Sequence, residues 1–239
     1  MDDAQSQIIG IRTQSLKKPY VSFDDAAQEW MRSLDGTGQS IAIETGITEV
    51  DKNWIFDRGG LHLIAGRAGM GKTTMASWVM ERMAQAGHPV MFFSLEMTRA
   101  QVVAKIVSAW AWLPLERAVG KLGVEEHRRI LAAVNINRNL PIYISDAATQ
   151  TVERIAMVSQ FAKASLGIDA IFVDYLQMVG VSERTESREQ KVAKVSAGLK
   201  ALAKRLDVPV IALAQLNRRP EERAGNRPTM GDLRESGSL

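Results

Sequence analysis

The stretch GRAGMGKTT, residues 66–74, decides the fold. It matches the pattern G-x-x-x-x-G-K-S/T and lies between an apolar run at 61–65 and a helix-like run at 75–86. In such a strand–loop–helix unit, glycines let backbone N–H groups point at phosphate oxygens, and the start of the helix adds positive charge. The stretch therefore predicts a site for a nucleoside triphosphate.

Each residue of this loop has an expected role. Lys72 is expected to reach the β and γ phosphates, and the Thr73 hydroxyl is expected to bind Mg²⁺. A glycine-rich turn without a ligand is the alternative, and the flanking strand and helix argue against it. The predicted nucleotide-binding residues are Gly66, Arg67, Ala68, Gly69, Met70, Gly71, Lys72, Thr73 and Thr74.

The composition favours one large domain. The 239 residues suffice for an α/β domain with its own core. Lys and Arg number 30 and Asp and Glu number 27, so a claim of nucleic-acid binding must rest on local clusters. There is no cysteine, the three histidines are scattered, and no apolar run reaches the ~18 residues of a membrane span. With its polar N-terminus, the sequence predicts a cytosolic protein without a membrane association.

Strand-like and helix-like segments alternate after residue 60. Helices are predicted to begin near Lys72, Thr98, Thr151 and Ser187, and Thr98 and Gln101 have the spacing of a capping box. Continuous apolar, β-branched strands that alternate with helices indicate an α/β fold, a mostly parallel sheet flanked by helices. The strand-like runs are residues 61–66, 89–96, 141–146, 168–179 and 208–216.

A short amphipathic helix is predicted at residues 22–34, ahead of this alternating region. Ser22 can cap it, and acidic residues fill its first turn. The break DGTGQ follows at 35–39. A lone helix of this length is marginal in water, so its apolar face must be buried. Periodicity alone leaves two surfaces open, the chain's own domain and a neighbouring subunit.

Three polar residues end apolar strands and are candidates for catalysis. Asp174 follows a buried run, at the strand end where ligands of open α/β sheets bind, so its carboxylate can hold the hydration shell of Mg²⁺. Glu96 could orient or deprotonate an attacking water, and Gln215 could sense the γ-phosphate. The alternatives are a turn cap for Asp174, a charge at a helix start for Glu96 and an ordinary polar strand end for Gln215.

Five segments together resemble the C-terminal motor domain of DnaB-type replicative DNA helicases. They are GRAGMGKTT, FFSLEM, IFVDYLQMV, LKALAKRLDVPVIALAQLNR and RPTMGDLRESGS, and the resemblance runs from about Thr45 to the last residue. It implies a RecA-like P-loop NTPase that binds ATP and Mg²⁺ at subunit interfaces of a hexameric ring and moves along single-stranded DNA. Glu96 is then the catalytic glutamate, Asp174 the metal-coordinating acid and Gln215 the phosphate sensor, with Lys72 in the catalytic set.

The resemblance also implies a domain organisation. Residues 1–21 form a flexible segment, 22–38 a linker helix and turn, and 39–239 the ATPase domain. The linker helix is expected to dock on the adjacent subunit, which favours the partner contact left open above. Primase or a helicase loader is a further expected partner, and the expected location is the bacterial cytoplasm or that of a phage-infected host.

Two polar, arginine-containing segments are expected to face DNA. They span residues 180–191 and 217–237, and neither contains an aromatic residue that could stack on bases. Arginine side chains and backbone N–H groups in such loops suit a phosphate backbone read without sequence preference. A solvated loop of mixed charge is the alternative for the first segment. The expected DNA-contacting residues are Arg188 in the first segment and, from the resemblance, Arg234, Glu235 and Gly237 in the second.

The chain departs from the family pattern at both ends. The family's N-terminal helical domain is missing, and the sequence stops at RESGSL, before the strands that carry an arginine finger in the family. The expectation is an ATPase domain that is incomplete at its C-terminal end and weakly active in isolation. It is either a fragment of a helicase or a natural short form.

Three functions remain open on the sequence. The leading hypothesis is an ATP-dependent helicase motor. The second is a recombination ATPase of the RecA/RadA type, against which the VDYLQ and DLRESG segments argue. The third is an ATP-binding assembly module without turnover.

Overall fold

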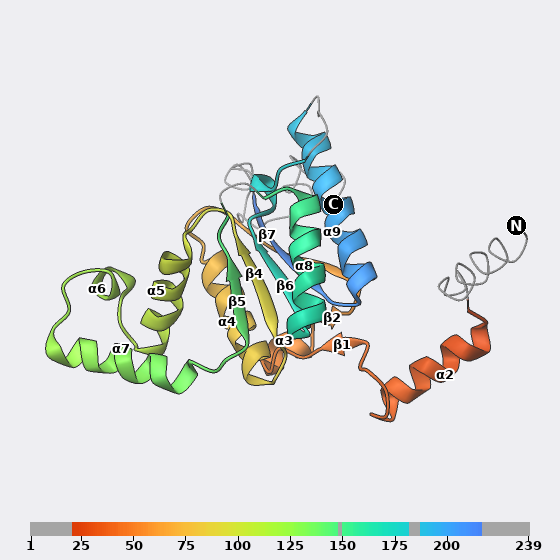
Figure 1. Ribbon diagram of the computed structural model, residues 1–239, viewed down its shortest axis with the longest axis horizontal. Helices are drawn as coiled ribbons and strands as arrows, with labels where there is room; N and C mark the ends of the chain where they lie inside the picture. The colour runs from red at the N-terminus through yellow and green to blue at the C-terminus, as the bar shows by residue number, and fades with distance from the viewer. Residues whose placement is uncertain (1–20, 148–149, 182–186, 217–239) are drawn as a thin grey trace, which may run out of the picture. The chain divides into compact units, whose positions relative to one another are not determined.

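A computed structural model describes residues 21–147, 150–181 and 187–216, and the side chain of Arg188 is not among the described groups. Its centre is a five-stranded parallel sheet with the strand order β3-β7-β6-β4-β5 (Figure 1). The strands are β3 (Leu61–Gly66), β4 (Val90–Ser94), β5 (Ile142–Ser145), β6 (Ala170–Asp174) and β7 (Val210–Gln215). The prediction of a parallel α/β sheet is confirmed.

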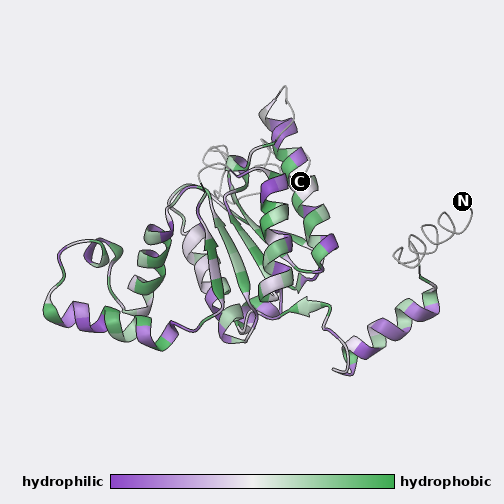
Figure 2. Cartoon of the chain, viewed as in Figure 1, coloured by the Kyte–Doolittle hydropathy of each residue, from purple (hydrophilic) through white to green (hydrophobic). Residues whose placement is uncertain are grey.

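The strands are buried on both faces because successive side chains alternate between two helical layers. Phe93 and Val173 belong to a core cluster with residues of α8 (Val152–Leu166) and α9 (Arg188–Leu206). Phe92 and Phe172, each one position earlier, belong to a second cluster with α4 (Lys72–Gln85) and α5 (Arg99–Trp110). The strands accordingly appear almost uniformly hydrophobic in Figure 2.

The helices begin where the sequence predicts. Thr98 and Gln101 form the capping box before α5. The hydroxyls of Thr151 and Ser187 accept hydrogen bonds from backbone N–H groups three residues later and cap α8 and α9. Each such cap contributes about 1 kcal/mol by satisfying an N–H group that the helix itself leaves open.

The remaining elements flank this framework. A two-stranded antiparallel sheet, β1 (Ala42–Ile43) with β2 (Phe56–Asp57), encloses the short helix α3 (Thr48–Asp51). A 3-10 turn, η1 (Leu176–Met178), follows β6. Within the described ranges, no helix combines the length and the apolar character needed to cross a bilayer.

A helical lobe consisting of α5, α6 (Leu115–Ala118) and α7 (Val124–Asn137) stands beside β5 (Figure 1). Neither α6 nor α7 is predicted from the sequence. Large apolar side chains are exposed on this lobe, among them Trp112, Val124 and Ile136. Trp112 also has a left-handed backbone with φ 53°, and its carbonyl oxygen accepts a hydrogen bond from Arg129 Nη2 at 2.8 Å.

Residues 1–41 form a compact unit separate from 42–239. Its described part contains α2 (Phe23–Leu34), and the Ser22 hydroxyl accepts a hydrogen bond from Asp25 N. The predicted helix is therefore confirmed. No residue of α2 is buried, and Phe23, Trp30, Met31 and Leu34 are exposed.

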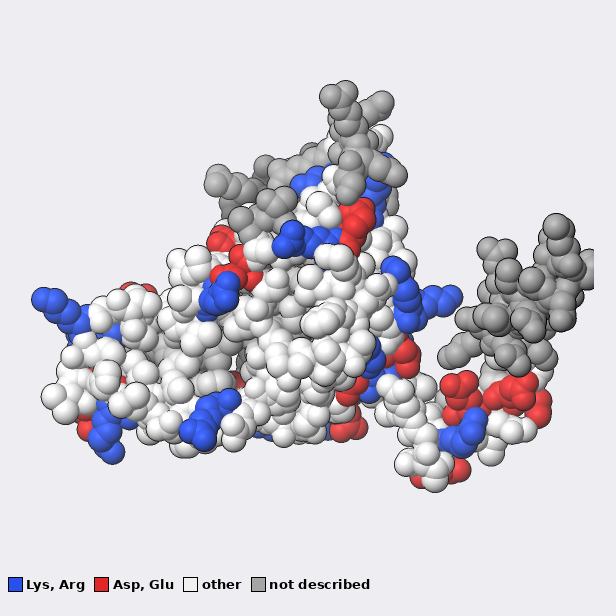
Figure 3. Space-filling view, viewed as in Figure 1, with Lys and Arg blue, Asp and Glu red and all other residues white. Residues whose placement is uncertain are grey.

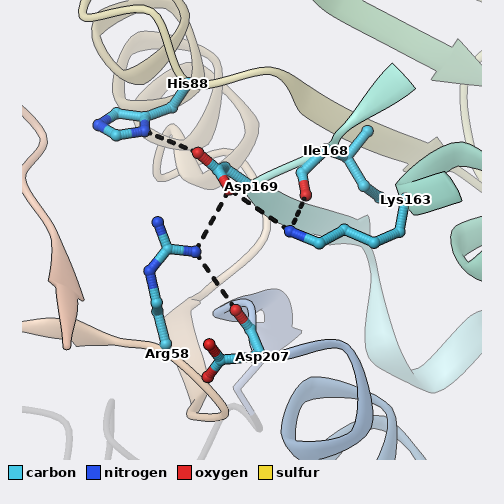
Figure 4. Close-up of polar contacts among 6 residues, drawn as sticks. All are labelled: Arg58, His88, Lys163, Ile168, Asp169 and Asp207. Atoms are coloured by element: carbon cyan, nitrogen blue, oxygen red, sulfur yellow. Dashed lines mark hydrogen bonds and ion pairs between the residues drawn. The ribbon is translucent and has the colours of Figure 1, made fainter. Parts of the chain in front are cut away.

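An ion-pair cluster holds the edge of the sheet where β4 and β6 begin (Figure 4). Asp169 lies 3.3 Å from Arg58 Nη1, 3.0 Å from His88 Nδ1 and 3.5 Å from Lys163 Nζ. Arg58 also donates to the carbonyl oxygen of Asp207 at 3.3 Å. Burial opposes ionisation of Asp169, but its hydrogen bonds to His88 and Arg58 outweigh burial and hold its pKa below the usual value. The cluster thus ties four connecting segments together, on the opposite edge from Asp174.

Candidate functional site

The loop between β3 and α4 has the backbone conformation that its glycines permit. Gly69 and Gly71 have φ values of 76° and 83°, in the left-handed region. A Cβ added at either position would meet no atom within 4 Å, so the backbone conformation, rather than crowding, requires glycine there. Gly71 is the N-cap of α4, so the N-terminal end of this helix faces the loop.

A pocket of about 330 Å³ adjoins this loop, within the size range of small-molecule sites. Lys72 Nζ donates to the carbonyl oxygen of Arg67 at 3.0 Å, so its ammonium group lies across the loop. The pocket therefore combines backbone N–H groups with a cation, which is the chemistry that phosphate groups require. Its lining residues are Ile64, Ala65, Gly66, Arg67, Met70, Gly71, Lys72 and Met75.

Thr73 and Asp174, 101 positions apart in the sequence, meet at this loop. The Thr73 hydroxyl donates to Asp174 Oδ2 at 2.8 Å. Burial raises the pKa of Asp174, the hydrogen bond from Thr73 lowers it, and the charge of Glu96 raises it further. Asp174 is only 3% exposed. A hydroxyl and a carboxylate at this distance are hard oxygen ligands of the kind that Mg²⁺ prefers.

A metal could not be held there by protein acids alone. Among the residues that the structure describes, no group of three or more His, Asp or Glu side chains could bind a metal ion. Mg²⁺ keeps several waters and takes ligands from substrate phosphates in such sites. The pair Thr73 and Asp174 therefore fits a metal that arrives with a nucleotide.

Glu96 lies at the neighbouring strand end. Ser94 is the register partner of Asp174, and Leu95 N donates to the Asp174 carbonyl oxygen at 2.9 Å. The Ser94 hydroxyl donates to the Met97 carbonyl oxygen at 2.7 Å, which fixes the turn that carries Glu96. The Glu96 side chain is exposed, and the residue precedes the N-cap Thr98, so it lies outside the first turn of α5. Two residues before the N-cap Thr98, this carboxylate is compatible with the alternative of a charge at the helix start as well as with a role in catalysis.

Gln215 ends β7, which lies between β3 and β6. It is the register partner of Gly66, and its side chain is exposed. Gln177, which the sequence analysis does not single out, binds the backbone of Gln215 through two hydrogen bonds. Gln177 Nε2 donates to the Gln215 carbonyl oxygen at 3.0 Å, and Gln215 N donates to Gln177 Oε1 at 3.3 Å. The only sequence signal for Gln177 is its place in the segment VDYLQ, three residues after Asp174.

The sheet thus brings Gly66, Asp174, Glu96 and Gln215 to one edge because the carboxyl ends of parallel strands coincide. The structure does not describe the side chains that are expected to contact DNA. Arg188 is the first residue of α9, but its side chain is not described. Arg234, Glu235 and Gly237 lie outside the described residues.

Residues 42–239 match the sequence model of the family described as the DnaB-like helicase C terminal domain. The replicative DNA helicase DnaB of Leifsonia xyli subsp. xyli is 35% identical over 251 residues, which cover 100% of this chain and 54% of that protein. The DnaB of Geobacillus stearothermophilus is 38% identical over 206 residues, which cover 84% of this chain and 45% of that protein. The chain therefore spans about half the length of these relatives.

Two solved structures have the same fold. One is the ATPase domain of a phage helicase, with a TM-score of 0.82 and 29% identity, covering 92% of this chain and 80% of that one. The other is a DnaB-like replicative helicase studied with its primase interactions, with a TM-score of 0.79 and 28% identity. It covers 100% of this chain and 59% of that one.

Proposed function

Because this chain belongs to the DnaB-like helicase C-terminal domain family, we propose that it is the ATP-hydrolysing motor of a replicative DNA helicase. Hydrolysis would drive translocation on single-stranded DNA and duplex unwinding. The observation that carries the proposal is the 2.8 Å contact between Thr73 and Asp174, which joins the phosphate loop to the acid at the end of β6. Family membership argues against the recombination-ATPase alternative.

The residues of the loop divide the binding of ATP among them. Backbone N–H groups between Gly66 and Thr74 bind the phosphates, and Lys72 exchanges the Arg67 carbonyl oxygen for the β and γ phosphates. Mg²⁺, when bound, neutralises charge on the phosphates. The Thr73 hydroxyl would hold the ion directly, and the buried carboxylate of Asp174 would hold the ion's hydration shell.

Glu96 and Gln215 act on the γ-phosphate side. The exposed carboxylate of Glu96 accepts the proton of the attacking water. The Gln215 amide contacts the γ-phosphate and reports its loss to the chain that follows β7. Gln215 is the last residue of β7 and Glu96 lies two residues after β4, the two strands that flank β6 and Asp174.

Single-stranded DNA is the proposed substrate of the loops that follow β6 and β7. Arg188 and Arg234 supply positive charge for phosphate groups, and Glu235 and Gly237 supply further contacts. Binding of this kind depends on salt rather than on sequence.

A homo-oligomer, in the form of a hexameric ring, is the proposed assembly. The apolar face of α2 docks on the α5–α7 lobe of a second copy. That lobe carries two apolar pockets, of about 250 and 400 Å³, which Val103, Val107 and Val134 line in common.

Charge supports the same pairing of surfaces. Residues 22–35 contain four acidic side chains and one arginine, whereas residues 99–138 contain seven Lys or Arg and three Glu. Figure 3 shows acidic side chains gathered on α2 and basic ones spread over the lobe. Opposite potentials of this kind steer association and fix its register.

Primase or a helicase loader is a further proposed partner, since one of the structural relatives was solved for its interactions with primase. The proposed site of action is the cytoplasm of a bacterium or of a phage-infected bacterium.

Steady-state ATP hydrolysis by the 239-residue chain, with and without single-stranded DNA, tests the function. We expect DNA-stimulated turnover that disappears in Glu96→Gln, while ATP binding persists. Lys72→Ala should lose ATP binding itself. Tight ATP binding without turnover under any condition would favour an assembly module, and wild-type ATP affinity in Lys72→Ala would contradict the assigned nucleotide site.

A further inference from the structure

Gln177 occupies a place where β7 has no strand beside it. The pairing of β6 with β7 ends at Val173 and Ala212, because β6 ends at Asp174. On its other side β7 continues to pair with β3, and Leu216 N donates to the Gly66 carbonyl oxygen at 3.1 Å. The side-chain amide of Gln177 takes the place that β6 leaves open.

This contact restrains the two peptide groups that flank Gln215, one through its N–H and the other through its carbonyl oxygen. A carboxamide has the donor and acceptor pattern of a peptide group, and Gln177 uses both against one residue, at 3.0 and 3.3 Å. Two bonds to the same residue restrain rotation of the backbone at Gln215. The direction of a strand side chain follows from its backbone, so the Gln215 amide is aimed by the same contact.

Satisfying a buried polar group does not explain the contact. Gln215 is exposed, so water could pair with its backbone groups at little cost. What Gln177 provides and water cannot is a fixed position relative to Asp174, three residues earlier on the same chain.

A third contact connects Gln177 to α9. Lys191 Nζ donates to the carbonyl oxygen of Gln177 at 3.4 Å. Lys191 lies in the first turn of α9, three residues after Arg188. The single residue Gln177 therefore touches the end of β7 and the start of α9, and it lies three residues after the metal-site acid Asp174.

We propose that Gln177 is a positioning residue that aims Gln215 at the nucleotide and links the nucleotide edge of the sheet to the start of α9. The inference rests on the proposed function, since it concerns how γ-phosphate sensing reaches the loops that face DNA. Gln177 itself touches neither nucleotide nor water in the reaction. Its removal changes turnover and coupling rather than ATP affinity.

Two substitutions separate positioning from stability. Gln177→Leu removes both hydrogen bonds to Gln215, whereas Gln177→Glu keeps an acceptor for Gln215 N and sets a carboxylate against the Gln215 carbonyl oxygen. Gln85→Leu is the matched control, because Gln85 is an exposed glutamine at the end of α4 that bonds Glu81 and Arg82 of its own helix. Should Gln177→Leu fail to fold, Gln177→Glu carries the test.

We expect both Gln177 variants to bind ATP within about threefold of wild type and to lose about 10- to 100-fold in kcat, because a misplacement of about 1 Å is enough for such a loss. DNA stimulation should fall with kcat, and Gln85→Leu should match wild type. Hydrogen exchange provides a readout that is independent of turnover. The Gln215 amide should lose protection in Gln177→Leu, and the change that ATP causes at residues 188–195 in wild type should disappear.

The outcomes separate this inference from the proposed function. If wild type hydrolyses ATP in a Lys72-dependent manner and Gln177→Leu retains that rate and its DNA stimulation, Gln177 does not position the sensor, and the proposed function stands. If wild type shows no turnover, the proposed function fails. Hydrogen exchange at the Gln215 amide then shows whether Gln177 fixes the backbone of Gln215. A wild-type chain without any ATP-dependent change at 188–195 overturns the link to α9.

Discussion

Asp174 must carry a charge for Mg²⁺ binding, but burial of that charge costs stability. Removing the charge should therefore lower ATP turnover and raise the stability of the nucleotide-free protein. Burial raises its pKa and so disfavours the carboxylate that Mg²⁺ binding needs. Asp174→Asn should reduce ATP turnover by at least about 100-fold, because a neutral amide replaces the charge that faces the metal. The same change should stabilise the nucleotide-free protein at pH 7 by about 1 kcal/mol, because no buried charge remains.

The pH dependence of that gain has a definite sign. A folded-state pKa above the unfolded value means that wild type gains stability as the pH falls through the folded pKa. The difference between Asp174→Asn and wild type should therefore shrink from pH 7 towards pH 4. Urea unfolding across this range measures it, and a variant that is less stable than wild type at pH 7 would refute the account of burial.

Asp169, at the other end of the same strand, provides the matched opposite case. Its pKa is lowered by the contacts with His88 and Arg58, so its contribution to stability is complete above the unfolded pKa and is lost as the pH falls through the folded value. Asp169→Asn should cost about 2 kcal/mol at pH 7, because it leaves partly buried cations without a counter-charge. The cost should shrink as the pH falls below the ordinary pKa of an aspartate and vanish once the pH is below the folded-state pKa, and nucleotide binding should not change. A penalty that stays constant with pH would show that packing, rather than charge, is lost.

At the scale of elements, the glycines at the two ends of α4 allow the effect of a strained backbone on stability to be separated from its effect on ATP binding. Gly71 before α4 and Gly87 after it have φ values of 83° and 90°, and a Cβ would meet no atom within 4 Å at either. Gly71→Ala and Gly87→Ala should each cost about 1–2 kcal/mol in chemical denaturation, since both force a side chain into left-handed backbone. Only Gly71→Ala should also weaken ATP binding, measured with a fluorescent analogue. Equal ATP affinities in the two variants would mean that the loop does not bind phosphate.

The elements of the sheet could be predicted from the sequence because their signals are local. Apolar runs such as 170–173, glycine-rich turns and caps such as Thr98 are each contained in a few residues. The lobe helix α7 has only one buried residue, Ala133, so its apolar periodicity is diluted by exposed Val124 and Ile136. A helix that displays apolar residues outward does not have the pattern of a helix packed on its own core.

Only those parts of the site that do not depend on the order of the strands could be predicted from the sequence. The ends of parallel strands share an edge whatever their order, so Asp174 and Glu96 could be placed there from the sequence. The contact of Gln177 with Gln215 depends on β7 lying beside β6 and extending past its end, and no spacing in the sequence encodes that. Cooperation between residues 38 positions apart is a property of the topology.

At the scale of the whole molecule, the exposed face of α2 predicts how copies assemble. Trp30→Asp places a charge in that face, so we expect the oligomer to dissociate in analytical ultracentrifugation while the melting temperature of the ATPase domain stays within about 2 °C. Gln28→Asp is the control, because it puts the same side chain at an exposed position that bonds Asp24 within the helix. Since ATP is expected to bind between subunits, turnover per chain should fall with dissociation and recover in part at high protein concentration, because assembly follows mass action. An oligomer that survives Trp30→Asp unchanged would exclude α2 as the docking helix and leave the apolar lobe formed by α5, α6 and α7 without its proposed partner.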